Sequence, residues 1–287
     1  MKILKICFLL FLPLISLGQN THSISNSKPF VLGRIDEIQS VQLSEKRILN
    51  IYLPEGYNQE DTTRYAVVYL LDGSQDEDFI HVTGLYQFNT FSWINRVPKS
   101  IVVGIANVDR RRDFTYPTTI QKDKDRFKTA GKSDKFIGFI EKELQPYIEK
   151  NYKVNNSKTI IGQSLGGLLA TEILLKKPTL FNQYIIISPS IWWDNGSLLN
   201  FDSAVLQENF SQATKVYIGV GKEGLTPTEI PRVMEVDANL LVEKLNKTKS
   251  KNLKIYFDYL PAEDHATVTH QAIFNALRLL NPTPAND

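Results

Sequence analysis

Cysteine is almost missing from this sequence of 287 residues, which contains only Cys7. An intramolecular disulfide bond is therefore excluded, and so are a cysteine-based metal site and a redox dithiol. The sequence also lacks any HExxH, CxxC, Walker or dinucleotide-type glycine pattern. We therefore predict neither a bound metal ion nor an organic cofactor.

An apolar run long enough for a membrane anchor is also lacking. The N-terminal run of residues 6–17 is shorter than the roughly 20 residues that a membrane helix needs, and Pro13 interrupts it. Two lysines precede this run, and Ser16-Leu17-Gly18 resembles a small-residue cleavage site. We predict that residues 1–18 are a cleavable signal peptide, which removes Cys7 and with it any thiol nucleophile. The mature protein is expected to be exported, periplasmic or secreted, without stable membrane insertion.

A charge excess of either sign is missing as well. The chain has 33 basic residues against 31 acidic ones, and residues 1–18 contain two lysines and no acid, which leaves 31 of each sign. Nucleic-acid-binding proteins usually carry a basic excess. We therefore predict no nucleic-acid partner.

Short apolar runs alternate with amphipathic stretches along most of the chain. The predicted strands cover residues 30–38, 47–53, 66–71, 101–105, 159–161, 184–187, 216–220 and 253–259. The predicted helices cover residues 76–91, 134–152, 165–177, 232–245 and 266–280. Such alternation is typical of an α/β fold, here a mostly parallel central sheet with an antiparallel N-terminal edge and helices on both faces.

No composition break divides the chain after residue 30, so we predict one domain over residues 30–281, preceded by a polar tail over residues 19–29. In parallel sheets, functional residues gather at the carboxyl ends of the strands. The loops that begin near residues 72, 106, 162, 188, 221 and 261 are therefore expected to form one face.

Ser164 is the predicted nucleophile. It lies between a predicted strand and a predicted helix, and Gly162 and Gly166 flank it in the spacing G-x-S-x-G. This spacing is typical of a sharp turn that exposes the serine hydroxyl and leaves no room for side chains on either side. The backbone N–H of Leu165 then lies at a helix N-terminus, where it can stabilise an oxyanion.

A serine nucleophile needs a base and, in most cases, an acid. In α/β-hydrolases the order along the chain is serine, acid, histidine, with the histidine after the last strand, which selects His265 among the four histidines. Glu223 is the first carboxylate after the strand 216–220 and is the predicted acid. Glu229 is one alternative, because the segment 225–231 separates Glu223 from the next predicted helix, and a Ser164–His265 pair without an essential acid is the other.

Other loops on the same face supply further candidates. Ser74, after Asp72-Gly73, is the predicted second oxyanion donor through its N–H. Arg112, in a loop with three successive arginines, is a candidate for binding an anionic or catechol-like substrate, and a purely structural arginine–carboxylate network is the alternative. Trp192 and Trp193 are candidates for a pocket wall, with core packing as the alternative.

Four motifs and the late histidine together resemble the putative-esterase family of α/β-hydrolases. The motifs are VYLLDG (68–73), RRDFTYP (111–117), GQSLGG (162–167) and SPSIWW (188–193). That family includes enterochelin esterases, S-formylglutathione hydrolases, feruloyl and acetyl-xylan esterases and mycolyltransferases. The resemblance is strongest to the siderophore-esterase branch, through SPSIWW and the arginine loop. It implies Ser164 as nucleophile, His265 as base, and Leu165 and the residue after Asp72-Gly73 as oxyanion donors.

The predicted function is hydrolysis of a small-molecule ester, such as a siderophore lactone or an acylated sugar, through an acyl-enzyme. An acyltransferase remains an alternative, because it differs only in the nucleophile that reaches the acyl-enzyme. A protein that binds a ligand without catalysis is the other alternative, and the presence of both Ser164 and His265 argues against it.

Overall fold

The computed structural model describes residues 27–226, 228 and 230–282. The chain divides into two compact units, Met1–Val31 and Leu32–Asp287. Of the first unit the described residues, 27–31, form neither helix nor strand. The predicted signal peptide, most of the predicted polar tail and Glu229 lie outside the described residues.

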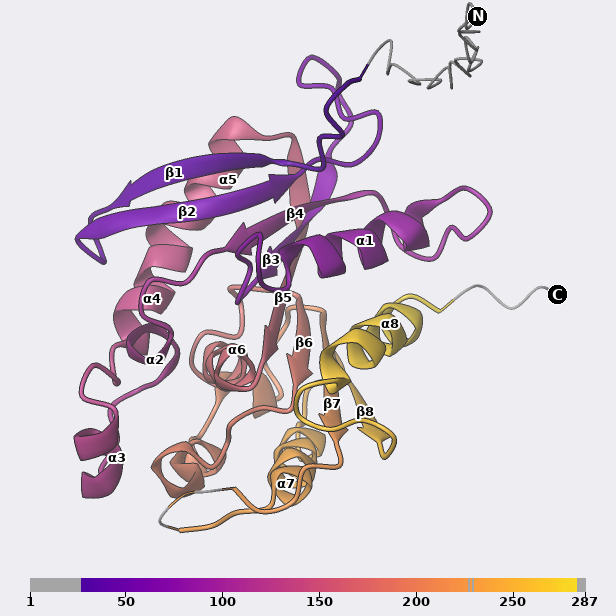
Figure 1. Cartoon of the computed structure of the whole chain (residues 1–287). Coiled ribbons are helices and arrows are strands. Elements are labelled where there is room, and N and C mark those ends of the chain that lie inside the picture. Colours follow the sequence, from indigo (N-terminus) through magenta and orange to yellow (C-terminus); the bar gives the residue numbers. More distant parts are fainter. Residues whose placement is uncertain (1–26, 227, 229, 283–287) are drawn as a thin grey trace, which may run out of the picture. The chain divides into compact units, whose positions relative to one another are not determined.

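The second unit is built on an eight-stranded sheet with the strand order β1-β2-β4-β3-β5-β6-β7-β8 (Figure 1). The strands are β1 (Arg34–Ser40), β2 (Glu45–Tyr52), β3 (Tyr65–Leu70), β4 (Ser100–Ile105), β5 (Val154–Gln163), β6 (Gln183–Ile187), β7 (Thr214–Gly221) and β8 (Leu253–Leu260). β2 pairs antiparallel with both β1 and β4, and every other neighbouring pair is parallel. The predicted mostly parallel sheet with an antiparallel N-terminal edge is confirmed, although its first strand begins at Arg34 rather than at residue 30.

Helices cover both faces of this sheet. The helices are α1 (Phe79–Thr90), α2 (Arg110–Phe114), α3 (Gln121–Arg126), α4 (Ser133–Phe139), α5 (Gln145–Asn151), α6 (Leu165–Lys176), α7 (Met234–Asn246) and α8 (Val268–Leu280). A π-helical turn, η1 (Ile140–Leu144), joins α4 to α5, and two 3₁₀ segments, η2 (Trp193–Asn200) and η3 (Ala204–Leu206), follow β6. The short helices α2 and α3 and both 3₁₀ segments were not predicted from the sequence.

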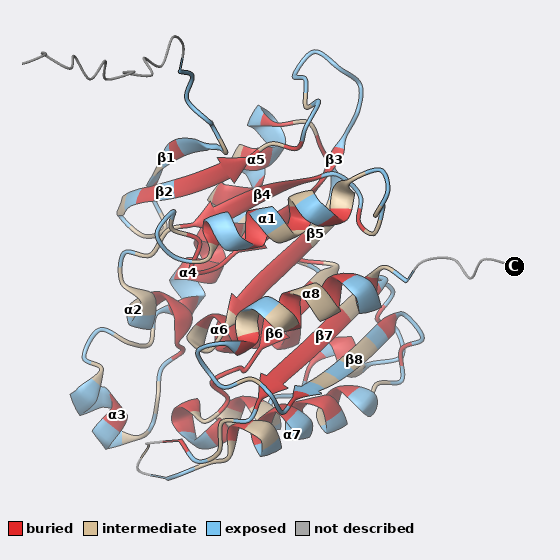
Figure 2. Ribbon diagram, turned by 45° about the vertical axis from the view of Figure 1, so that its right-hand side comes forward, coloured by how far each residue is buried: buried red, intermediate tan, exposed pale blue. Residues whose placement is uncertain are grey.

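The two faces of the sheet follow from the two-residue period of the strands. In β3, Val67 and Tyr69 pack into one buried cluster with α4, α5, α6 and α7, whereas Val68 and Leu70 pack into the other cluster with α1 and α8. Because both faces are covered, the central strands are continuously apolar and buried (Figure 2). Among the helices of the described residues, none has the length and apolar character that crossing a membrane requires.

Candidate active site

The turn between β5 and α6 holds Ser164 in a conformation that few residues adopt. Its backbone has φ 60° and ψ −118°, and its N–H donates a hydrogen bond to the Ile187 oxygen at 3.0 Å. A Cβ atom added at Gly162 would lie 2.3 Å from the Gly166 oxygen, well inside van der Waals contact. Glycine is therefore required at position 162 by the tightness of the turn, which raises the Ser164 hydroxyl above the carboxyl end of β5.

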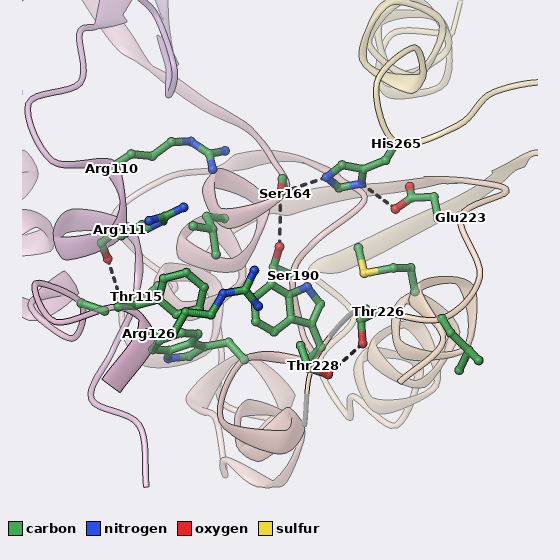
Figure 3. Close-up of a pocket in the computed structure, with 17 residues that line it drawn as sticks. Arg110, Arg111, Thr115, Arg126, Ser164, Ser190, Glu223, Thr226, Thr228 and His265 are labelled. Atoms are coloured by element: carbon green, nitrogen blue, oxygen red, sulfur yellow. Dashed lines mark hydrogen bonds and ion pairs between the residues drawn. The ribbon is translucent and has the colours of Figure 1, made fainter. Parts of the chain in front are cut away.

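Ser164, His265 and Glu223 form a continuous chain of hydrogen bonds (Figure 3). Ser164 Oγ lies 3.0 Å from His265 Nε2, and His265 Nδ1 lies 2.6 Å from Glu223 Oε2. A neutral imidazole with its proton on Nδ1 donates to the carboxylate and accepts the serine hydroxyl through Nε2. The structure thus brings together the predicted nucleophile, base and acid.

Three loops at the carboxyl edge of the sheet deliver these side chains. Glu223 follows β7, and His265 lies between β8 and α8. The Glu223 side chain is buried, with 4% of its surface exposed, whereas 47% of the His265 side chain is exposed. A solvent-accessible imidazole beside a buried carboxylate is suited to exchange protons with a substrate while its orientation stays fixed.

Polar residues at the end of β5 and in the loop after β6 contact all three members of this hydrogen-bond chain. Gln163 Nε2 donates to the His265 backbone oxygen at 2.9 Å. The Ser188 hydroxyl donates to Glu223 Oε1, and Ser190 Oγ lies 3.3 Å from Ser164 Oγ. Sequence analysis gave these three residues no role, although Gln163 lies in GQSLGG and both serines lie in SPSIWW.

The two predicted oxyanion donors differ in their surroundings. The Leu165 N–H belongs to the first turn of α6, where backbone N–H groups lack an acceptor within the helix, and Leu165 lines the pocket described below. The Ser74 N–H donates to Glu77 Oε2 at 3.4 Å, and Ser74 is not among the pocket-lining residues. Both assignments remain predictions, and Leu165 is the better placed of the two.

Arg110 ties the loop after β3 to the nucleophile turn. Its guanidinium donates to both carboxylate oxygens of Asp72, at 2.6 and 2.9 Å, and to the backbone oxygen of Gln163 at 3.2 Å. Asn107 Nδ2 also donates to Asp72, at 2.7 Å. The loops after β3, β4 and β5 therefore meet around the Asp72 carboxylate, in agreement with the single face predicted for them.

Arg112 does not have the position that a substrate contact requires. Its guanidinium donates to Glu45 at 2.5 and 3.0 Å and to Asp113 at 2.7 Å, and it does not line the pocket. The hydrogen bonds that Arg112 donates to the carboxylates of Asp113 and Glu45 raise the pKa of its guanidinium group. The prediction of a substrate contact is corrected: Arg112 belongs to an arginine–carboxylate network, which was the alternative, and Arg110 and Arg111 line the pocket instead.

The pocket in front of Ser164 has a volume of about 450 Å³. Its wall combines cations with aromatic and aliphatic side chains: Arg110, Arg111, Arg126, Phe127, Trp192, Trp193, Leu225 and Met234. The guanidinium groups of Arg111 and Arg126 lie 4.7 and 5.0 Å from the centre of the Phe127 ring. Figure 3 shows the three arginines on one side of Ser164, and His265 and Glu223 on the other.

Both tryptophans contribute to this wall, and one of them is also part of the core. Trp193 is 1% exposed and donates from Nε1 to the Tyr116 oxygen at 2.8 Å. Trp192 is less buried and meets Trp193 edge to face, with ring centres 6.1 Å apart. Trp193 therefore lines the pocket and also packs in the core, which were the two alternatives considered for this pair.

Comparison with known proteins agrees with this geometry. The family model described as "Putative esterase" matches residues 40–272. The chain belongs to this family. Together with its similarity to siderophore esterases and serine hydrolases, this shows that the protein is an esterase with an α/β-hydrolase fold.

Individual proteins also resemble the chain over most of its length. The ferri-bacillibactin esterase BesA of Bacillus subtilis is 29% identical over 82% of this chain and 85% of its own length. The crystal structure of an IroE-like serine hydrolase from Shewanella oneidensis superposes with a TM-score of 0.75 at 31% identity, covering 87% of this chain and 80% of that one. A BES protein from Bacillus cereus has a TM-score of 0.76 at 28% identity, covering 92% of this chain and all of its own.

Proposed function

We propose that this esterase hydrolyses its substrate through an acyl-enzyme on Ser164. The observation that carries the proposal is the hydrogen-bond chain from Ser164 Oγ through His265 to Glu223, at 3.0 and 2.6 Å. A serine hydroxyl alone is a weak nucleophile, and an adjacent imidazole that accepts its proton activates it.

The first half of the reaction forms the acyl-enzyme. Ser164 Oγ attacks the ester carbonyl carbon while its proton passes to His265 Nε2, and the carbonyl oxygen becomes an oxyanion. The Leu165 N–H, with Ser74 as the second candidate, donates to this oxyanion, and the Glu223 carboxylate stabilises the imidazolium. The imidazolium then gives its proton to the departing alcohol as the C–O bond breaks.

The second half restores the enzyme. Water gives a proton to His265 Nε2 and attacks the acyl carbon, and Ser164 leaves with that proton as the carboxylic acid is released. An acyltransferase would use an alcohol in place of this water. Product analysis separates the two: hydrolysis gives free acid in proportion to substrate consumed, and transfer gives a new ester when an acceptor alcohol is added.

Labelling of the nucleophile tests the mechanism directly. A fluorophosphonate reagent should form an adduct on Ser164, detected by peptide mass spectrometry, and Ser164→Ala should remove both the adduct and turnover of a p-nitrophenyl ester. Retention of a tenth of wild-type turnover by a folded Ser164→Ala protein would refute the acyl-enzyme mechanism.

We propose a siderophore ester with aromatic, anionic iron-binding groups as the substrate. The support is the pocket wall, which Trp192 lines and where Arg111 and Arg126 lie beside Phe127, together with the similarity to BesA, a ferri-bacillibactin esterase. Arginine binds anionic oxygens and stacks on aromatic rings, so this wall suits catecholate groups. Among the described residues, the Arg111 side chain has no carboxylate within ion-pair distance that would compete for it.

A substrate panel tests this assignment. It contains a ferric catecholate trilactone, a neutral ester of hydroxamate type and an acetylated xylan fragment, each at several concentrations. The largest kcat/KM is expected for the catecholate trilactone. A larger kcat/KM for the acetylated sugar would move the assignment to carbohydrate esters and leave the acyl-enzyme mechanism in place.

We also propose that the protein is exported after cleavage at residue 18. The support is the N-terminal pattern of two lysines, a short apolar run and a small-residue site. The N-terminal mass of the protein recovered from the periplasm or the medium tests this, and a mature chain that retains residues 1–18 would refute it.

A further inference from the structure

The segment Ser188-Pro189-Ser190 follows β6 and contacts the series of hydrogen bonds that joins Ser164, His265 and Glu223. Its first serine contacts the acid Glu223, and its second contacts the nucleophile Ser164. We propose that Ser188 is a positioning residue for catalysis, which holds the Glu223 carboxylate in the orientation that His265 requires. This inference rests on the proposed serine mechanism.

The Ser188 hydroxyl is buried and its direction is fixed. Ser188 is 0% exposed, and its N–H donates to the Gly219 oxygen at 2.8 Å. The Gly221 N–H points at Ser188 Oγ from 3.5 Å, so Oγ is the acceptor on that side. The hydroxyl proton is therefore directed toward Glu223 Oε1, to which it donates.

The backbone of Ser188 is in the left-handed region, with φ 41°. Glycine adopts this region without strain, whereas a serine there is strained through its Cβ atom. What serine adds over glycine at this position is the hydroxyl group, and that hydroxyl is bonded to the active-site carboxylate.

Each oxygen of the Glu223 carboxylate needs a hydrogen-bond donor because the side chain is buried. Its Oε2 receives the hydrogen bond from His265 Nδ1, and within the described part of the chain Ser188 is the only donor to Oε1. A buried carboxylate oxygen without a donor is costly, so the side chain would rotate toward water if the Ser188 hydroxyl were absent. Such a rotation would break the hydrogen bond from His265 Nδ1 to Glu223, which orients the imidazole and stabilises its protonated form.

Kinetics of Ser188→Ala and Ser188→Gly test the inference. Both remove the hydroxyl, and glycine does so at a φ that it adopts without strain, which ensures a folded variant. We expect kcat for a neutral p-nitrophenyl ester to fall by roughly tenfold to a hundredfold with KM nearly unchanged, because Ser188 acts on Glu223 and not on the substrate.

Ser203→Ala is the matched control, since Ser203 is also buried and its hydroxyl donates to the Leu175 oxygen at 2.6 Å, outside the active site. Its kcat should equal that of the wild type.

A double-mutant cycle separates positioning from a general effect on folding. In a Glu223→Gln background, Ser188→Ala should change kcat by less than about twofold, because the group through which it acts is already lost. Wild-type kcat in both Ser188 variants, or an equal loss in both backgrounds, would overturn the role of Ser188. A Ser164→Ala protein that stays active would instead refute the serine mechanism, and the role of Ser188 with it.

Discussion

Gln163 and His265 are joined by a hydrogen bond of 2.9 Å from the Gln163 side chain to the His265 backbone oxygen. The residue before Ser164 thus anchors the loop that carries His265, although Gln163 and His265 are separated by 102 positions in the chain. One side chain therefore links the position of Ser164 to that of His265, and this relationship leads to the first prediction.

Gln163→Ala should lower kcat about tenfold while KM for a short neutral ester stays nearly constant, because the hydrogen bond from Gln163 holds the loop that carries His265 in position. Steady-state kinetics checks this. Gln145→Ala is the control, because the Gln145 side chain also donates to a backbone oxygen, that of Leu180 at 3.1 Å, away from the active site. Equal kinetic effects in the two variants would contradict the anchoring role.

Glu223→Gln should lower kcat by about 10³- to 10⁴-fold, because the amide keeps the shape of the side chain but loses the charge that stabilises the imidazolium. The measurement is kcat with a p-nitrophenyl ester, alongside Glu229→Gln. We expect Glu229→Gln to remain close to wild type. A severe loss in Glu229→Gln alone would reassign the acid, and near wild-type rates in both variants would indicate a Ser164–His265 dyad.

Arg111→Gln should raise KM for an anionic aromatic ester about tenfold and leave KM for a neutral ester of the same size nearly unchanged, because its guanidinium lines the pocket beside Phe127. Arg112→Gln is the comparison. It should affect both substrates alike and lower the free energy of unfolding by about 2 kcal/mol, since it breaks the bonds to Glu45 and to buried Asp113. Equal KM changes for both substrates in Arg111→Gln would argue against an anion-binding wall.

Asp78→Asn should stabilise the protein at neutral pH. Burial, with smaller effects from the carboxylates of Asp72 and Glu77, raises the pKa of Asp78 from 3.8 to about 6. The folded protein binds a proton more tightly than the unfolded chain here, so stability present below pH 3.8 is lost as the pH rises through about 6. The asparagine removes this penalty, and because solvent screens the partly exposed group we expect a gain of only about 1 kcal/mol.

Thermal unfolding of both proteins at pH 4.0 and pH 7.5 provides the measurement for Asp78→Asn. The gain should be small at the lower pH and full at the higher one, since at pH 4.0 the Asp78 carboxyl group of the folded protein is still mostly protonated and uncharged. A gain of the same size at both values would indicate a cause other than the charge of Asp78.

Local sequence features were sufficient to predict the architecture and the sharp turn at Ser164. Runs such as 66–71 and 101–105 are apolar without a break, and only a strand buried on both faces favours that pattern in so short a segment. The glycine spacing indicated the turn at Ser164, because the steric exclusion at Gly162 comes from the backbone of Gly166 and Gly167, which are its neighbours in the chain. Strand ends were predicted less well, as at β1, because the pairing partner decides where a strand begins.

The three successive arginines show what the sequence by itself left open. They lie in helix α2, where each residue is rotated by about 100° from the one before, so neighbours point in different directions. Arg110 reaches Asp72, Arg112 reaches Glu45, and Arg111 faces the pocket beside Phe127. Since α2 was not predicted, nothing in the composition of the loop distinguished a substrate contact from an ion pair.

Local steric exclusion and the periodicity of apolar residues are properties of the sequence. They are enough to predict a mostly parallel sheet with Ser164 at a sharp turn and His265 after the last strand. Only the tertiary structure decided which side chains of the other loops meet them. Ser188 and Glu223 are 35 positions apart, and Gln163 and His265 are 102 apart. Contacts over such separations depend on the order of the strands in the sheet and on the rotamers that packing allows, and neither is encoded within a short window of sequence.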